Sequence, residues 1–296
     1  MTISPLSGWT NHNYRIEFKN QAYVLRIAGV GSEMYIDRQA EEKNINLAAH
    51  LGITTAPLFH DSATGIQLRP FIEGDVLDNQ LGALPAHTIG KIGEVLRLLH
   101  NSPCKFTNKV DNFTAIDQYK TLIQQQQQPL DKAYDDLYPT ITEIRNKLAA
   151  VSGTTVPCHN DPNLTNFILT PENKLFLMDW EYAGNGDAAW DLGYLSSYGS
   201  FTSAEDDILL SAYQPPLGRD PYFLSRMLLY KPVSGFISAL WIRLQIINGH
   251  FPVPEAELEE AEYLSLHKVQ ENFSDQAFQH ALRSLPPLTR MGTPSV

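Results

Sequence analysis

A polar loop between two apolar segments carries the side chains that could do chemistry. It reads His-x-Asp-x-x-x-x-Asn, with His159, Asp161 and Asn166 at the named positions, and Asp179 follows at the end of the next apolar segment. A carboxylate such as Asp161 can orient an acceptor hydroxyl, and the oxygens of Asn166 and Asp179 are hard ligands of the kind that Mg²⁺ prefers. Because phosphoryl transfer needs mainly positioned reactants and metal ions over the phosphate charge, this set predicts phosphoryl transfer. We expect His159 to brace the loop rather than to react.

Two short strands must position these groups. The apolar residues 167–169 and 175–178 are separated by a turn sequence that begins at Pro171. Paired as a hairpin, these strands would bring Asn166 and Asp179 close together in space.

Apolar periodicity predicts the remaining elements. Alternation predicts antiparallel strands at 14–18 and 23–27, with further strands around 56–60 and 65–72, and helical spacing predicts helices at 36–51, 88–99, 131–151, 201–213, 221–248, 255–271 and 275–283. Thr88 is the expected N-cap of its helix, and Gly52 is the expected C-cap of the first helix. The glutamine run at 124–128 is expected to be an exposed helix end or linker, and the tail at 286–296 is expected to fray.

Composition excludes several classes of protein. The chain has 296 residues, of which 43% are hydrophobic, and a formal net charge of −11. This length favours two lobes, and the acidic balance without any basic run argues against nucleic-acid partners. No stretch has the length and apolarity of a membrane span or a signal peptide, and Cys104 and Cys158 are expected to be reduced thiols. We therefore expect a cytoplasmic protein without membrane insertion.

The loop and its surroundings resemble a known family. Residues 179–184 (DWEYAG) and 190–193 (WDLG) follow the His-Asp-Asn loop, and together they resemble the choline/ethanolamine kinase family. This family is a choline kinase-like and thiamine kinase-like branch of the aminoglycoside phosphotransferase superfamily. The resemblance extends from about residue 6 to about residue 245. It implies an α+β, protein-kinase-like two-lobed fold, in which residues 1–74 form a small antiparallel-sheet N-lobe and residues 75–296 a larger, mostly helical C-lobe. It also implies ATP and Mg²⁺ as cofactors.

The N-terminal part resembles the nucleotide-binding region of this family. Residues 6–15 are similar to the loop that covers the ATP phosphates, which implies nucleotide contacts for Gly8, Thr10 and Asn11. Small and polar residues suit a close approach of the backbone to phosphate. Residues 67–74 are similar to the hinge whose backbone faces adenine.

A basic residue and an acid complete the expected nucleotide site. Arg26 stands where protein kinases carry a lysine that contacts the phosphates, and a guanidinium can form two hydrogen bonds with phosphate oxygens. Glu41 is the acid expected to pair with Arg26, with Glu42 as the alternative. An ordinary surface ion pair is the other interpretation of Arg26 and Glu41.

The acceptor pocket is less well defined. Trp241 resembles the choline kinase tryptophan that packs against a trimethylammonium group, an attraction of about 0.5–2 kcal/mol, although a core position would also suit it. Ser238 replaces a second tryptophan that choline kinases often have, and Tyr198 stands where eukaryotic choline kinases carry an acid. Together with Asp161, we expect Glu181, Tyr198 and Trp241 to bind the acceptor.

Three polar residues are expected to serve structure. Asp191 should accept hydrogen bonds from the backbone of the catalytic loop, as its family counterpart does. Cys158 has no nearby partner at metal-ligand spacing, so we expect a small core residue. His100, at a helix end, is expected to be a satisfied polar group.

The sequence therefore predicts an ATP-dependent, Mg²⁺-requiring kinase of a small hydroxylated amine, with choline or ethanolamine first. Thiamine is the next candidate. An aminoglycoside would need several acids in the C-lobe, for which Glu205, Asp206 and Asp207 are a possible source. A noncatalytic kinase-like binding module is the alternative from another class, and the oligomeric state stays open.

Overall fold

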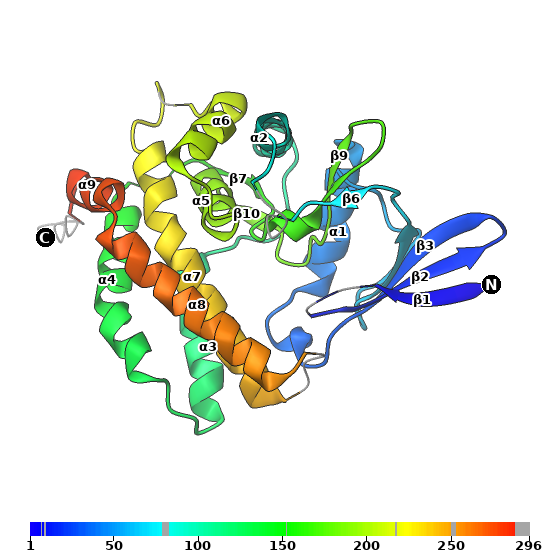
Figure 1. Ribbon diagram of the computed structural model, residues 1–296, viewed down its shortest axis with the longest axis horizontal. Coiled ribbons are helices and arrows are strands. Elements are labelled where there is room, and N and C mark those ends of the chain that lie inside the picture. Colours follow the sequence, from blue (N-terminus) through cyan, green and yellow to red (C-terminus); the bar gives the residue numbers. More distant parts are fainter. Residues whose placement is uncertain are drawn as a thin grey trace, which may run out of the picture.

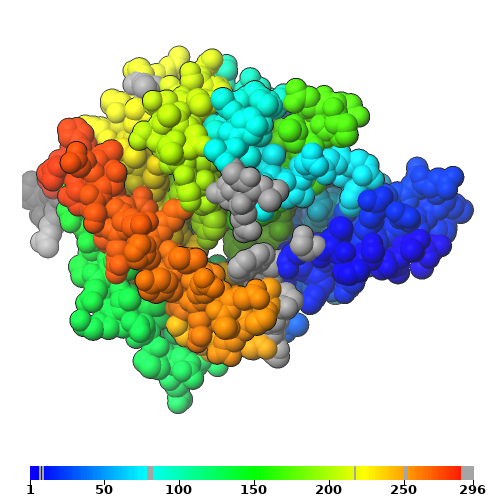
Figure 2. All heavy atoms as spheres, in the orientation of Figure 1, coloured from blue at the N-terminus to red at the C-terminus, as the bar shows by residue number. Residues whose placement is uncertain are grey.

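An antiparallel sheet lies at one side of the molecule, and a larger group of helices lies at the other (Figure 1). The computed structural model describes residues 1–6, 8, 10–78, 83–151, 153–216, 218–249 and 253–287. This arrangement confirms the predicted α+β fold with a small N-lobe and a mostly helical C-lobe. In the space-filling view the blue N-lobe projects from the remainder of the chain (Figure 2).

The N-lobe sheet has five strands in the order β1-β2-β3-β5-β4. Their bounds are Thr2–Leu6 (β1), His12–Phe18 (β2), Gln21–Ile27 (β3), Phe59–Asp61 (β4) and Ile66–Pro70 (β5). Lys19 and Asn20 join β2 to β3 with φ angles of 49° and 60°, the conformation typical of a two-residue hairpin turn. The predicted strands at 14–18, 23–27 and 65–72 are confirmed. β4 lies three residues later than the start predicted for it, and β1 was not predicted as a separate strand.

Helix α1 (Arg38–His50) connects the sheet to the rest of the molecule. It follows a short 3-10 helix, η1 (Ser32–Met34), and the Asp37 carboxylate accepts hydrogen bonds from the backbone at its N-terminus. Gly52 has a φ of 73° just beyond its end, which confirms the expected C-cap position. Ile45 and Ala48 pack in a hydrophobic cluster with residues of the C-lobe. Burial of this face fixes α1 between the two lobes.

Eight helices of the described residues build the C-lobe. They are α2 (Ala86–His100), α3 (Asn112–Gln125), α4 (Lys132–Ala149), α5 (Ala188–Tyr198), α6 (Ser203–Tyr213), α7 (Phe223–Asn248), α8 (Glu255–Ser274) and α9 (Gln276–Ser284). One hydrophobic cluster joins α3, α4, α7, α8 and α9, and the other joins α2, α5 and α6 to the region of the polar loop. No helix among the described residues combines the length and the apolar composition needed to cross a membrane.

The sequence prediction of these helices was good in the interior and poorer at the ends. Ile89, Ile92, Leu96 and Leu99 are fully buried, as the apolar stripe of α2 predicted. The prediction of Thr88 as its N-cap was wrong, because the helix begins at Ala86. Helices α3 and α5 were not predicted. The glutamine run spans the exposed end of α3 and the turn after it, and residues 288–296 of the predicted frayed tail lie outside the described residues.

Short strands surround the polar loop. Their bounds are Asp75–Val76 (β6), Thr155–Cys158 (β7), Phe167–Leu169 (β8), Leu175–Leu177 (β9) and Gly184–Asp187 (β10), with a 3-10 turn, η2 (Leu164–Asn166), before β8. β8 and β9 form the predicted hairpin, and β6 adds to it through β8. The lobe boundary near residue 74 stays a prediction, which the pairing of β6 with a C-lobe strand supports.

Candidate active site

The polar loop that carries His159, Asp161 and Asn166 is held by hydrogen bonds to its backbone. Asp191 is completely buried on α5, and its carboxylate accepts hydrogen bonds from the backbone nitrogens of His159 and Asn160, each at 2.8 Å. Asn160 has a φ of 66°, an uncommon conformation that these bonds stabilise. Asp191 also lies 3.0 Å from Nε2 of His100. These contacts confirm the expected structural roles of Asp191 and His100.

Asp161 is oriented through both of its carboxylate oxygens. The hydroxyl of Tyr194 donates a hydrogen bond to Oδ1, and Nδ2 of Asn166 donates to Oδ2 at 3.2 Å. Burial raises the pKa of Asp161 to about 7, and the charges of Asp179 and Glu181 add to this effect, whereas the two hydrogen bonds oppose it. The side chain is thus held in one orientation. With a pKa of about 7, its protonated and ionised forms are similarly populated at neutral pH.

The β8–β9 hairpin brings the two expected metal ligands together. The backbone nitrogen of Met178 donates to the carbonyl oxygen of Asn166 at 2.7 Å, which places Asp179 beside the start of β8. Because Nδ2 of Asn166 is bonded to Asp161, its Oδ1 is left for a ligand, and no described residue donates a hydrogen bond to it. Asp179 is 35% exposed, and among the described residues only Arg26 contacts its carboxylate, at 3.3 Å from Oδ1. Two available hard oxygens fit a Mg²⁺ ion that keeps waters and phosphate oxygens as its other ligands.

His159 braces the loop from within the core. It is fully buried, its Nε2 lies 2.9 Å from the carbonyl oxygen of Met178, and its ring meets Trp180 edge-on at 4.8 Å. Burial lowers the pKa of His159 to about 4, so the ring is neutral at pH 7. This geometry supports the bracing role that was predicted for it.

Arg26 and Glu41 form the ion pair expected in the N-lobe. Their closest N–O distance is 2.5 Å, and both side chains are buried. The acid that pairs with Arg26 is therefore Glu41, as expected, and not the alternative Glu42. Burial of both partners also rules out an ordinary surface ion pair. The pair connects β3 with α1, and Arg26 continues to Asp179 across the lobes.

Glu181 lies in a charge network that sequence reasoning did not find. Its Oε2 accepts hydrogen bonds from Arg38 at 2.9 Å and from Asn11 at 3.1 Å, and it lies 3.8 Å from Arg26. Arg38 also donates to Glu41 at 2.8 Å. The carboxylate thus faces the N-lobe, and its expected contact with the acceptor stays a prediction. The Arg-x-x-Glu spacing on α1 was the one sequence signal that pointed to Arg38.

The expected nucleotide loop packs tightly against its own chain. Asn11 is buried, and its Oδ1 accepts a hydrogen bond from the backbone nitrogen of Gly29 at 3.3 Å. A Cβ atom at Gly8 would lie 2.7 Å from the carbonyl oxygen of Asn11, and one at Gly29 would lie 2.2 Å from that of Thr10. Glycine is therefore required at both positions. Ser7 and Trp9 of this loop lie outside the described residues.

Aromatic side chains extend from Asp161 toward α7. Tyr198 stacks on Tyr194 with ring centroids 4.6 Å apart and an interplanar angle of 10°. The hydroxyl of Tyr198 donates to Oγ of Ser238, so the two residues that depart from the choline kinase pattern bond to each other. Trp241 is half-buried one turn further along α7, on the same helix face as Ser238. The structure thus connects Asp161 through Tyr194 and Tyr198 to the face of α7 that carries Trp241.

A second pair of aromatic residues, Tyr35 and Tyr119, lies near Trp241. Burial raises the pKa of the Tyr35 hydroxyl, and the polar side-chain atoms of Trp241 and Gln245 near that hydroxyl oppose this shift. The ring of Tyr119 meets Tyr35 edge-on at 5.8 Å. Tyr35 follows η1 and Tyr119 lies on α3, so neither was detectable from the acceptor motif.

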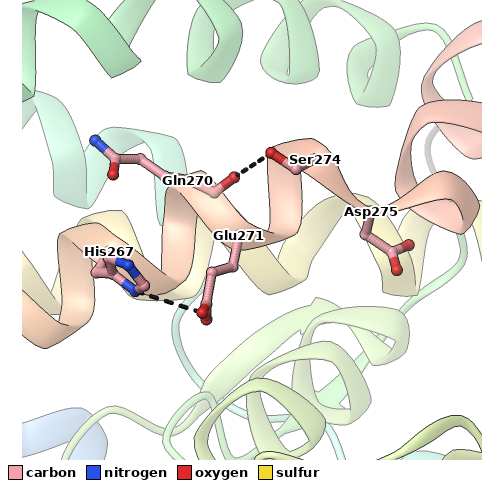
Figure 3. Close-up of a pocket in the computed structure, with 5 residues that line it drawn as sticks. All are labelled: His267, Gln270, Glu271, Ser274 and Asp275. Atoms are coloured by element: carbon pink, nitrogen blue, oxygen red, sulfur yellow. Dashed lines mark hydrogen bonds and ion pairs between the residues drawn. The ribbon is translucent and has the colours of Figure 1, made fainter.

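Two other features of the described residues do not form a site. A shallow depression on α8 is lined by His267, Gln270, Glu271, Ser274 and Asp275 (Figure 3). It is open, and Figure 3 shows His267 paired with Glu271 and Ser274 bonded to the Gln270 backbone. The buried trio of His100, Cys158 and Asp191 has its His and Asp atoms engaged in hydrogen bonds, and burial raises the pKa of the Cys158 thiol. Cys158 is a core residue, as expected.

Comparison with known proteins agrees with this geometry. The model of the phosphotransferase enzyme family matches residues 2–223. The chain belongs to this family. LicA of Haemophilus influenzae is 26% identical to this phosphotransferase family member over 215 residues, which is 71% of the chain and 62% of LicA. The chain therefore spans less than two thirds of the length of that relative.

Solved structures place this family member in the choline kinase-like branch. A choline/ethanolamine kinase family protein from Mesorhizobium loti has a TM-score of 0.79 and 28% identity, with 96% of this chain and 92% of that protein covered. Choline kinase LicA from Streptococcus pneumoniae has a TM-score of 0.78 and 27% identity, with 90% and 94% covered. A complex of LicA with AMP has a TM-score of 0.79 and 26% identity, with 92% of both chains covered.

Proposed function

We propose that the protein transfers the terminal phosphoryl group of ATP to the hydroxyl of a small amine, choline or ethanolamine. The observation that carries the proposal is the hydrogen bond from Tyr194 to Asp161, because it joins the candidate base to a stack of aromatic rings. The choline kinase function of LicA and its complex with AMP support the same acceptor and nucleotide.

In the proposed mechanism the chain positions two reactants. Asp161 orients the acceptor hydroxyl and takes its proton while the oxygen bonds to the terminal phosphorus, and the bridging oxygen leaves with ADP. Arg26, held by Glu41, binds phosphate oxygens. Mg²⁺ held by Asn166 and Asp179 would neutralise phosphate charge. Tyr194 and Asn166 keep the Asp161 carboxylate in one orientation throughout.

The aromatic surroundings favour a quaternary ammonium group. A ring face attracts a cation through its quadrupole, and it needs no hydrogen bond from the cation. Tyr198 stands where eukaryotic choline kinases carry an acid, and its hydroxyl is already bonded to Ser238. Trp241 and Tyr35 supply further rings. We therefore infer that choline is preferred over ethanolamine, whose ammonium group needs hydrogen-bond acceptors.

The other candidate functions have less support. Of the three acids that might meet an aminoglycoside, Glu205 forms a capping box at the start of α6, and Asp206 pairs with Lys231 at 2.6 Å. Only Asp207 is exposed. No contact among the described residues specifically favours thiamine. A noncatalytic module would have no use for the arrangement of Asp161, Asn166 and Asp179.

The proposal is tested by ADP release with ATP and Mg²⁺ against choline, ethanolamine, thiamine and kanamycin. Turnover with choline well above the other acceptors is the expected result. Turnover with kanamycin alone would contradict the proposed acceptor, and nucleotide binding without any turnover would favour a noncatalytic module.

Replacing Trp241 with alanine is expected to raise the KM for choline about tenfold while the KM for ATP changes less than about twofold. The loss of a cation–π contact and of a desolvated ring face accounts for this size. Steady-state kinetics with each substrate varied in turn measure it. Tyr263→Ala, which removes a 65% exposed ring on α8, is the control. Equal changes in both KM values would assign Trp241 to packing.

Replacing Asp179 with asparagine is expected to remove the effect of Mg²⁺ on ADP binding. In the wild-type protein Mg²⁺ should tighten ADP binding by at least about tenfold, since an ion held by Asp179 would neutralise phosphate charge. Calorimetric titration with and without Mg²⁺ gives the ratio for each protein. Asp207→Asn, at an exposed position of α6, should keep the wild-type ratio. An unchanged ratio in Asp179→Asn would remove Asp179 from the metal site.

A further inference from the structure

Arg69 is a basic residue that the site described above does not use. It lies on β5 directly opposite Val24 of β3, and Gln67 lies opposite Arg26. Directly paired residues, and residues two apart on one strand, point to the same side of a sheet. Arg69 therefore shares its face of the sheet with Arg26 and Gln67, and this is the face that meets Glu41 of α1.

Arg69 differs from its basic neighbours in forming no ion pair with an acid among the described residues. Arg26 pairs with Glu41 at 2.5 Å, and Arg38 pairs with Glu41 at 2.8 Å and with Glu181 at 2.9 Å. Within the part of the chain that the structure describes, the Arg69 side chain makes no hydrogen bond and no ion pair. Glu41 and Glu181 are thus paired with the other two guanidinium groups.

The surroundings of Arg69 penalise its charge. The residue is half-buried, and burial lowers the pKa of its guanidinium to about 10; the charge of Asp179 opposes this shift and that of Arg26 adds to it. The group remains charged at neutral pH. Removing a cation from water without giving it an acceptor costs free energy. Arg69 is therefore a cation without an ion pair among the described residues, and the charges of Arg26 and Asp179 both act on it.

We propose that Arg69 is a second phosphate-binding cation of the nucleotide site, beside Arg26. This inference rests on the proposed kinase function. A nucleoside diphosphate or triphosphate brings the negative charge that Arg69 lacks, and the planar guanidinium can donate two parallel hydrogen bonds to phosphate oxygens. The shared sheet face places Arg69 with the residues expected to bind nucleotide, not with the aromatic residues around Tyr198.

Calorimetric titration of ADP and of adenosine into wild-type protein and Arg69→Gln tests this inference. ADP should bind about tenfold to a hundredfold more weakly to the variant, the effect of losing charge-assisted hydrogen bonds. Adenosine has no phosphate, so its affinity should change less than about twofold. Arg69→Lys keeps the charge but cannot donate two parallel hydrogen bonds. Its affinity for ADP should lie between those of wild type and Arg69→Gln. Arg97→Gln, at an exposed position of α2, is the matched control and should behave as wild type.

Thermal unfolding separates binding from folding. Without ligand, Arg69→Gln should be at least as stable as wild type, since the removed charge has no partner, and ADP should raise its melting temperature less. If wild-type protein binds no ADP, the proposed function and this inference both fail. If wild type binds ADP and Arg69→Gln binds it equally well, only the assignment of Arg69 is overturned. Equal weakening of ADP and adenosine would also overturn it, because the contact would then involve the base or the packing of the cleft.

Discussion

Replacing Asp161 with asparagine is expected to lower kcat by about a thousandfold while ADP binding changes less than about twofold. A positioned general base contributes about 10²–10⁴ to a rate, and asparagine keeps the shape of the side chain without its ability to take a proton. Both oxygens of Asp161 are oriented, by Tyr194 and by Asn166. The substitution therefore removes a carboxylate that is already positioned to accept a proton. Choline-dependent ADP release measures kcat, and calorimetry measures ADP binding.

The control variant for this experiment also loses one carboxylate. Asp207→Asn removes an exposed carboxylate from the C-lobe and should retain wild-type kcat. A kcat for Asp161→Asn within about tenfold of wild type would exclude Asp161 as the base. Equal loss of turnover and of ADP binding would point instead to a collapsed loop. The comparison therefore separates chemistry from folding.

Replacing Asp191 with alanine is expected to lower the free energy of unfolding by about 3–5 kcal/mol, the effect of breaking a buried charged contact. Two backbone nitrogens of the catalytic loop and the His100 ring would lose their acceptor in a fully buried place. Buried donors without a partner cost far more than exposed ones. Urea denaturation followed by fluorescence measures the change.

An exposed aspartate in an ion pair provides the comparison for Asp191. Asp117 pairs with Arg145 at 2.8 Å, and both side chains are more than 40% exposed. Asp117→Ala should cost less than about 1 kcal/mol, as exposed ion pairs do. Asp191→Asn keeps the volume of the side chain and should be less destabilising than Asp191→Ala. Equal stabilities of Asp191→Ala and Asp117→Ala would show that the loop does not depend on Asp191.

The sequence alone allowed good prediction of elements with a strong local pattern. The stripe on α2 was correct because four leucine and isoleucine residues recur at helical spacing and all are buried. Helix α5 was missed because every residue from Ala188 to Ser197 is buried, which leaves no polar face and no periodic signal. The N-cap at Thr88 was wrong because a threonine within the first turn has the same sequence signature as a cap.

Prediction of the candidate site was likewise good for local contacts and poor for contacts that depend on packing. Asp161, Asn166 and Asp179 were predicted together because a loop and a hairpin are local structures, and short connections leave few ways to arrange them. Tyr194 was not predicted to contact Asp161, because that contact depends on how α5 packs behind the loop. The bond between Tyr198 and Ser238 likewise joins two helices.

The sequence by itself indicated the candidate groups for the chemistry and the family to which the chain belongs, because residue type and spacing carry both. Only the tertiary structure decided which charges meet. Asn11 and Arg38 reach Glu181 from the other lobe, and Arg69 forms no ion pair with any acid of the described residues. The physical reason is that a long-range ion pair depends on how the lobes pack and on which cation comes closest to each acid. Neither the packing of the lobes nor the distance between a cation and an acid follows a periodic pattern along the sequence.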